Sequence, residues 1–226
     1  MIHFLLCTLG SPDLVELVLR SIDRYAGECV VDLVKLPDET TSPLAHGQAI
    51  DFWRDRQKIG VRDNDIVIIL DPDSVLLSDY FRVELDAAFS DPAIGIWGAG
   101  SAQDWGPRIH ASMMAIRGCV FTTLQKSFAP CPDPREQAWR DTGGLYCMWA
   151  QAAGWALQPV ERGPDWGGAS AWWDGALVPL WAHLGGGTHS DVTRMTWKQR
   201  YLVPWRRREI RKRRIFIDAA QGHLLA

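Results

Sequence analysis

The sequence predicts an α/β fold built on a largely parallel sheet. Apolar segments of strand length, at residues 2–9, 29–36 and 65–70, alternate with helical patterns at residues 11–26 and 44–60. Strands that alternate with helices in this way predict βαβ units, whose strands run parallel. The segment "DIVIIL" also lacks the polar alternation of a half-exposed strand, which is typical of a parallel strand covered on both faces.

The first elements each have local signals of their own. Residues 2–9, "IHFLLCTL", are nearly all apolar and predict a buried strand. In the helix that follows, Ser11 is a suitable N-cap, Pro12 fits the first helical position, and Asp13 favours the positive end of the helix dipole. The second helix is expected to end near Gly60. Residues at helical spacing form the expected buried face of the first helix: Leu14, Leu17, Val18, Ser21 and Ile22.

The second half of the chain gives weaker patterns. Residues 93–100 and 108–118 are candidate strands, and residues 134–154 look helical on either side of Gly143 and Gly144. The stretch that follows, up to residue 190, is rich in Trp and Gly, and its composition does not place strands. No internal repeat is visible.

Composition excludes several classes of protein. The chain has 226 residues, of which 47% are hydrophobic and 23% charged, as in a soluble globular protein. Its five cysteines contain no CxxC pair, which argues against a disulfide framework and a thiolate zinc site and indicates a reducing compartment. The N-terminus lacks a basic region, and no run of 18 apolar residues occurs. We therefore expect no signal peptide, no transmembrane segment and a cytoplasmic location.

Charge is distributed unevenly along the chain. The net charge is −3, but ten Lys or Arg and one Glu lie between Arg194 and Arg214, interleaved with Trp197, Tyr201 and Trp205. This pattern is typical of nucleic-acid binding, with aromatic rings that could stack on bases. It also fits an anionic membrane surface, a solvated and partly disordered end, or a helix that pairs with the acidic body. We predict a domain at 1–190 and a distinct basic aromatic C-terminal segment at 191–226.

Two carboxylates end the third predicted strand. Asp71 and Asp73 directly follow "DIVIIL", with Pro72 between them to stiffen the turn. In an open α/β sheet, ligands bind beyond the carboxyl ends of the strands. Two like charges so close together are unfavourable unless a cation neutralises them. Mg²⁺ and Mn²⁺ prefer such oxygen ligands, so the pair predicts a divalent-metal site; an Asp that caps a turn beside a solvent-facing Asp is the alternative.

The segments "FLLCTLGSPDLVELVLRSI" and, later, "LDPDS" after a buried strand resemble the GT-A fold glycosyltransferases, in the broad family-2 style. The resemblance implies a Rossmann-related sheet flanked by helices, and a DxD motif that holds Mn²⁺ or Mg²⁺ against the diphosphate of a nucleotide-sugar donor, with UDP as first candidate. It implies that Thr8 and Gly10 line the nucleotide pocket, and that His46 and Gly47 lie near the nucleotide and sugar. The family's "DDGS"-type sequence is absent here, where "KLPDETTSP" stands instead.

The resemblance extends to a late histidine and a base. In "PLWAHLGGGTHS", His183 is similar to the histidine that completes the metal shell in several of these enzymes, and Gly185 would let the backbone approach a diphosphate. A structural His beside a glycine-rich loop is the alternative. Asp141, in "WRDTGGLY", is the first candidate for the general base that deprotonates the acceptor hydroxyl. A helix N-cap or an ion pair with Arg would also explain it.

A basic tail on a small GT-A-like chain also resembles the phage-type and base-J-type glycosyltransferases that modify hydroxymethylated bases in DNA. The acceptor would then be a hydroxymethylpyrimidine, presented single-stranded or flipped out of the duplex, and the protein could be virus-encoded. Candidate acceptor-binding residues are His110, Trp166, Trp172, Trp173, Asp174, Arg206, Arg207 and Arg208. The three tryptophans could stack on a sugar or a base, or they could be core residues. His110 and Asp174 are also weaker candidates than Asp141 for the general base.

Three other readings remain open from the sequence. A glycosyltransferase could act on a glycan or lipid acceptor at a membrane surface. "IILDPDSV" also fits the DxD of haloacid-dehalogenase-type phosphatases, although that motif usually lies on the first strand. A non-catalytic nucleic-acid-binding protein with a degenerate enzyme fold is the third. The sequence contains no GxGxxG or GxxxxGK[ST] motif.

Overall fold

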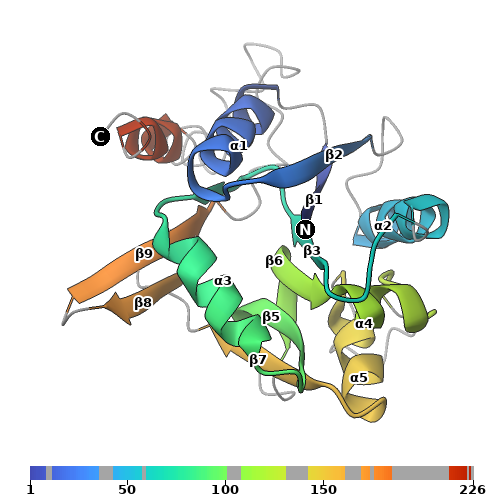
Figure 1. The fold of residues 1–226 in the computed structure, drawn as a ribbon. Coiled ribbons are helices and arrows are strands. Elements are labelled where there is room, and N and C mark those ends of the chain that lie inside the picture. The colour runs from blue at the N-terminus through green and yellow to red at the C-terminus, as the bar shows by residue number, and fades with distance from the viewer. Residues whose placement is uncertain are drawn as a thin grey trace.

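The computed structural model has a six-stranded sheet and a separate three-stranded sheet, with helices on both faces of the larger one (Figure 1). The structure describes residues 1–8, 12–35, 43–57, 60–100, 108–130, 142–160, 169–173, 176–184, 214–222 and 224.

The first half of the chain alternates strand and helix, as the sequence predicts. The elements are β1 (Ile2–Thr8), α1 (Pro12–Tyr25), β2 (Cys29–Lys35), α2 (Pro43–Gln57) and β3 (Ile66–Leu70). β1 pairs in parallel with both β2 and β3, so the predicted βαβ units are confirmed.

The second half adds strands in both directions. β3 and β5 each pair antiparallel with β6, whereas β5 pairs in parallel with β7, which gives the order β2-β1-β3-β6-β5-β7. A short antiparallel sheet, β4-β9-β8, stands apart and was not predicted. The elements are β4 (Ser74–Leu76), α3 (Tyr80–Ser90), β5 (Ile94–Gly100), β6 (Ile109–Arg117), α4 (Gly118–Thr123), α5 (Gly144–Ala152), β7 (Ala156–Val160), β8 (Ala169–Trp173) and β9 (Ala176–His183).

The larger sheet separates two hydrophobic cores, and β3 contributes to both. Val67 and Ile69 pack in the core that includes residues of α2, α4 and α5, whereas Ile68 and Leu70 pack in the core that includes residues of α1 and α3. All four side chains are 0% exposed. Burial on both faces explains why this strand shows no polar alternation.

The chain returns to the body at its C-terminal end. Residues 214–222 are helical, and Phe216, Ala220 and Leu224 are buried in the core shared with α1. The Arg24 guanidinium of α1 donates a hydrogen bond to the carbonyl of Leu224. The predicted boundary at residue 190 stays a prediction, but the described end of the basic segment is part of the body's packing. None of the helices in the described stretches has the length and apolar character needed to cross a membrane.

Candidate metal centre at the edge of the sheet

The predicted DxD motif forms a tight turn where β3 ends. The backbone N–H of Ser74 donates to the Asp71 carbonyl at 3.0 Å, which closes a four-residue turn. Pro72 occupies the second position of that turn, where its fixed φ is favoured. The Asp71 N–H donates to the Ser112 carbonyl of β6 at 3.3 Å, and this ties the turn to the neighbouring strand.

The end of β9 lies beside this turn. β4 pairs antiparallel with β9 so that Ser74 is opposite His183, and the Leu184 N–H donates to the Asp73 carbonyl at 3.0 Å. Trp181 anchors the strand, because its ring packs edge-on against Trp97 with centroids 5.6 Å apart. Backbone pairing and aromatic packing thus fix His183 next to the DxD turn.

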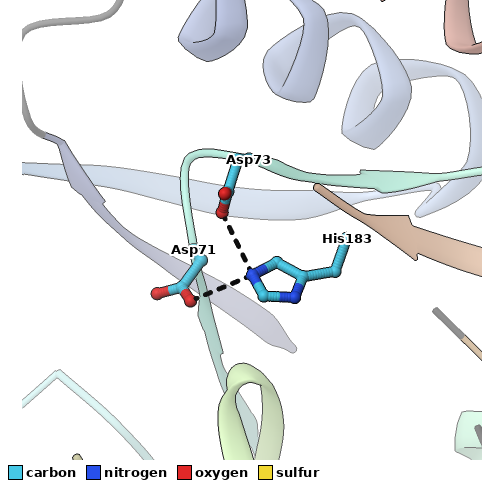
Figure 2. Close-up of side chains that lie close together, drawn as sticks. All are labelled: Asp71, Asp73 and His183. Carbon is cyan, nitrogen blue, oxygen red and sulfur yellow. Dashed lines mark ion pairs between the residues drawn. The ribbon is translucent and has the colours of Figure 1, made fainter. Parts of the chain in front are cut away.

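Asp71, Asp73 and His183 converge on one point (Figure 2). The His183 Nε2 lies 3.2 Å from Asp73 Oδ1 and 3.6 Å from Asp71 Oδ2. One ligand atom from each of the three residues lies within 4.8 Å of the others, so the group could hold a metal ion. Two carboxylates and one imidazole form a donor set that suits Mn²⁺, and Mg²⁺ through the carboxylates.

Two orphaned polar atoms beside this group also fit a polar ligand. His46 Nε2 and Ser74 Oγ are buried and have no hydrogen-bond partner among the residues that the structure describes. A buried polar group without a partner is costly, and it often marks the place of an ion or a water. Both atoms belong to residues at the DxD turn or next to it.

Nearby histidines explain how the carboxylates of Asp71 and Asp73 can lie so close together. Burial by itself would raise the pKa of the Asp71 carboxyl, but the close contact with His183 and the charges of His46, His183 and His110 lower it well below its usual range. Burial would likewise lower the pKa of His183, but its close contacts with Asp71 and Asp73 and their charges raise it to about 10. Without a metal, the imidazolium of His183 therefore supplies the positive charge between the two aspartates.

Two further histidines approach Asp71 from other elements. His46, on α2, places its Nε2 3.7 Å from Asp71 Oδ1. The His110 ring, on β6, lies 6.0 Å from the His183 ring, centroid to centroid. The Ser112 N–H donates to His110 Nδ1 at 3.0 Å, so in the neutral ring the proton resides on Nε2. Neutral His110 is consequently a hydrogen-bond donor through Nε2 and not a base at Nδ1.

The other predicted site residues fall into two groups. Thr8 ends β1, which runs parallel to β3, and Gly47 lies in α2 against the backbone of Phe128 and Ala129, which explains this glycine without a ligand. Trp172 and Trp173 lie in β8, and nothing is described of their side chains. The remaining predicted residues lie outside the described residues: Gly10, Asp141, Trp166, Asp174, Gly185, Arg206, Arg207 and Arg208.

The sequence did not point to two residues of the centre. Ser112 acts through its backbone, since its N–H and carbonyl bond His110 and Asp71, and a backbone role leaves no signal in residue type. Ser74 follows the DxD motif directly, and its burial opposite His183 depends on the unpredicted β4-β9 pairing. Only the position of Ser74 beside the motif could have suggested it.

Together the mixed sheet and the metal-ligating group at its edge define an α/β protein with a candidate divalent-metal centre. Neither a protein-family model nor a curated protein matches the chain in sequence. In structure, the chain is similar to glycosyltransferases. A mannosyltransferase from Pyrobaculum calidifontis, solved with GDP-Man and Mn²⁺, is 14% identical over 73% of this chain and 55% of its own, with a TM-score of 0.48.

Two other solved glycosyltransferases are also similar. One, involved in glycosylation of the major capsid of PBCV-1, is 13% identical over 70% of this chain and 81% of its own, with a TM-score of 0.46. The apo form of GlyE from Streptococcus pneumoniae TIGR4 is 11% identical over 69% of this chain and 44% of its own, with a TM-score of 0.41. The chain thus spans about half the length of the first of these three structures. At these scores the likeness carries no argument about activity, which rests below on the chain's own residues.

Proposed function

We propose that the protein is a metal-dependent glycosyltransferase that moves a sugar from a nucleotide-sugar, with UDP as the first candidate nucleotide, to an acceptor hydroxyl. The observation that supports this most is the convergence of Asp71, Asp73 and His183 at the sheet edge. The carboxyl ends of β1 and β3 meet at that same edge, which is where open α/β sheets bind nucleotides.

Each residue of the centre has a chemical task in this reaction. Asp71, Asp73 and His183 would hold Mn²⁺ or Mg²⁺ through one oxygen or nitrogen each. A divalent ion bound there supplies positive charge that stabilises the nucleoside diphosphate as it leaves. His110 would donate a hydrogen bond from Nε2 to the substrate in this site, and the Ser112 N–H fixes the tautomer that allows it.

We also propose that Asp141 is the general base. A base must take the proton of the acceptor hydroxyl as its oxygen attacks the anomeric carbon. His110 is unsuited to this in its neutral form, because Nδ1 already accepts a hydrogen bond and Nε2 carries the proton. A carboxylate therefore remains the better candidate, and an Asp141→Asn change should abolish transfer while sugar-nucleotide binding persists.

For the acceptor, a hydroxymethylpyrimidine in DNA remains our proposal. Its support is the charge of the segment from Arg194 to Arg214, where ten cations and one Glu interleave with three aromatic residues. Triple charge reversal at Arg206, Arg207 and Arg208 should abolish transfer to such DNA and leave hydrolysis of the sugar nucleotide unchanged. Unchanged transfer to DNA would remove the tail from acceptor binding, and a glycan or lipid acceptor would become the better candidate.

The first test is isothermal titration of UDP, and then of GDP, into the protein with Mn²⁺ and with EDTA. Binding that needs Mn²⁺ and disappears in Asp73→Asn supports the proposal. A panel of sugar donors with hydroxymethylated DNA then follows. Turnover of a phosphate ester without sugar nucleotide would favour a phosphatase instead. DNA affinity with neither nucleotide binding nor dependence on Asp71 and Asp73 would favour a non-catalytic binder.

A further inference from the structure

The two oxygens of the Asp71 carboxylate face imidazoles from two different elements. His183 of β9 approaches Oδ2 at 3.6 Å, on the side of the metal-ligating group, and His46 of α2 approaches Oδ1 at 3.7 Å. A carboxylate that binds a metal through one oxygen leaves the other free to accept a hydrogen bond. Partners of this kind orient metal ligands and tune their basicity.

We propose that His46 is a positioning residue for the metal centre, donating from Nε2 to Asp71 Oδ1 so that Oδ2 is presented to the ion. The proposal rests on the metal-binding part of the proposed function and adds a residue that lies outside the ligand set. Among the described residues, His46 forms its ion pair with Asp71, so its effect on the ion would pass through that carboxylate.

The burial of His46 also supports this role. His46 has a side chain only 16% exposed, and its Nε2 is buried without a hydrogen-bond partner among the described residues. Its ion-pair partner, Asp71 Oδ1, lies at 3.7 Å, about 0.5 Å beyond the length of a normal hydrogen bond. A buried donor so close to an ionised carboxylate gains from closing that gap, because hydrogen bonds to charged groups are the stronger ones.

The packing of α2 against residues 127–129 holds His46 at this distance from Asp71. Gly47, the next residue, lies so close to the backbone of Phe128 and Ala129 that a Cβ there would be 2.3 Å from the Ala129 Cα. One turn further on, Asp51 accepts hydrogen bonds from the Ser127 hydroxyl at 2.5 Å and the Phe128 N–H at 3.1 Å. The contacts of Gly47 and Asp51 thus fix this turn of α2, and with it the position of His46 relative to Asp71.

The experiment measures Mn²⁺ affinity directly, by electron paramagnetic resonance of free Mn²⁺, on full-length protein stripped with EDTA and at one fixed pH. His46→Leu removes the donor, and His46→Gln keeps an N–H near the place of Nε2. The matched control is His3→Gln. His3 is also a half-buried histidine whose Nε2 lies 3.3 Å from a carboxylate, but that carboxylate is Asp65, at the opposite end of β3.

We expect His46→Leu to weaken Mn²⁺ binding about 10- to 100-fold, while His46→Gln and His3→Gln stay close to the wild type. Calorimetric melting of each metal-free variant separates this from loss of fold. If His46→Leu proves unfolded, the comparison of His46→Gln with His46→Asn, whose shorter amide cannot reach Oδ1, takes its place. Weaker binding by His46→Asn alone supports the proposal.

Two results would overturn the inference. The first is wild-type Mn²⁺ affinity in His46→Leu while Asp71→Asn loses binding, which leaves the metal centre and the proposed function intact. The second is equal weakening by His46→Gln and His46→Leu in folded protein, because a retained donor then fails to rescue. Absence of Mn²⁺ binding in the wild type would instead contradict the metal-dependent function on which the inference rests.

Discussion

One ring nitrogen of His110, Nδ1, already accepts a hydrogen bond, and this determines which nitrogen can interact with a substrate. Because Nδ1 accepts the Ser112 N–H at 3.0 Å, only Nε2 can donate in the neutral ring. Substitution by Asn or by Gln distinguishes the two nitrogens of His110. The amide nitrogen of Asn can take the position of Nδ1, and that of Gln can take the position of Nε2. The two substitutions therefore test which nitrogen matters.

We predict that His110→Gln keeps most of the transferase rate and that His110→Asn lowers kcat about 100-fold, as loss of a single preorganised donor does. Mn²⁺ affinity should change far less than in Asp73→Asn, because both variants keep all three residues of the metal-ligating group. Steady-state kinetics with Mn²⁺ titration measures both quantities. Wild-type rates in both variants would show that neither nitrogen of His110 meets the substrate.

Asp65 is a carboxylate away from the metal centre whose pKa contributes to stability in acid. Burial would raise the pKa of its carboxyl, but the Arg62 N–H at 2.8 Å and the hydrogen bond with His3 help to lower it below its ordinary value. A lowered pKa in the folded state means that the ionised carboxylate stabilises the protein above about pH 4, and that this stability is lost as the pH falls below that value.

We predict that Asp65→Asn lowers the free energy of unfolding at pH 7 by about 1–3 kcal/mol and flattens the loss of stability on the acid side. Urea unfolding at a series of pH values, in EDTA, measures both effects. A variant that loses stability with acid as steeply as the wild type would show that other carboxylates govern this range.

At the scale of elements, α2 is held by the close approach of Gly47 to a neighbouring backbone. A Cβ at this position would lie 2.3 Å from the Ala129 Cα and 2.7 Å from the Phe128 carbonyl carbon. Neither atom belongs to a flexible side chain, so the helix itself would have to move. Ala is otherwise the better helix former by about 1 kcal/mol, and the two effects oppose each other.

We predict that overpacking wins and that Gly47→Ala destabilises the protein by about 1–3 kcal/mol. Gly222→Ala is the matched control, because Gly222 is also a helical glycine and none of the described residues lies within 4 Å of its added Cβ. That variant should be neutral or slightly more stable. Chemical denaturation of both variants measures the change in the free energy of unfolding. A stabilising Gly47→Ala would contradict the prediction and would mean that α2 relaxes without cost.

The elements also show what the sequence could and could not predict. β1, α1 and β3 have strong local patterns, and their predicted ranges agree with the structure because burial acts on contiguous residues. The small sheet escaped prediction, since β4 has only three residues and β9 contains Pro179 within a run without alternation. Of the centre, Asp71, Asp73 and His183 were predicted through motif and resemblance. The contact of His46 with the Asp71 carboxylate was not, because it depends on how α2 docks.

At the scale of the whole molecule, the C-terminal helix completes a core that begins at β1. Phe216 is 1% exposed within that core, whereas the adjacent Ile215 is 43% exposed. Cationic residues dominate the sequence just before this helix. The three buried positions, Phe216, Ala220 and Leu224, are spaced four apart and gave too weak an apolar pattern to predict docking.

We predict that Phe216→Ala lowers the free energy of unfolding by about 3–5 kcal/mol, as for other large core side chains. Ile215→Ala, its neighbour on the exposed side, should change it by less than about 0.5 kcal/mol. Thermal or urea unfolding distinguishes them. Similar small effects from both would indicate that the helix is dispensable for the body.

The pairing of β9 with β4 also sets the order in which the metal centre can assemble. Asp71 and Asp73 emerge early in the chain and sit on a turn that its own backbone hydrogen bond closes, whereas His183 comes from the last strand of the small sheet. During synthesis on a ribosome the two aspartates would repel each other and lack His183 until most of the chain had been made and β9 had docked. Binding of a divalent ion by all three residues would then be one of the last events of folding, and it would show that β9 has docked against the DxD turn.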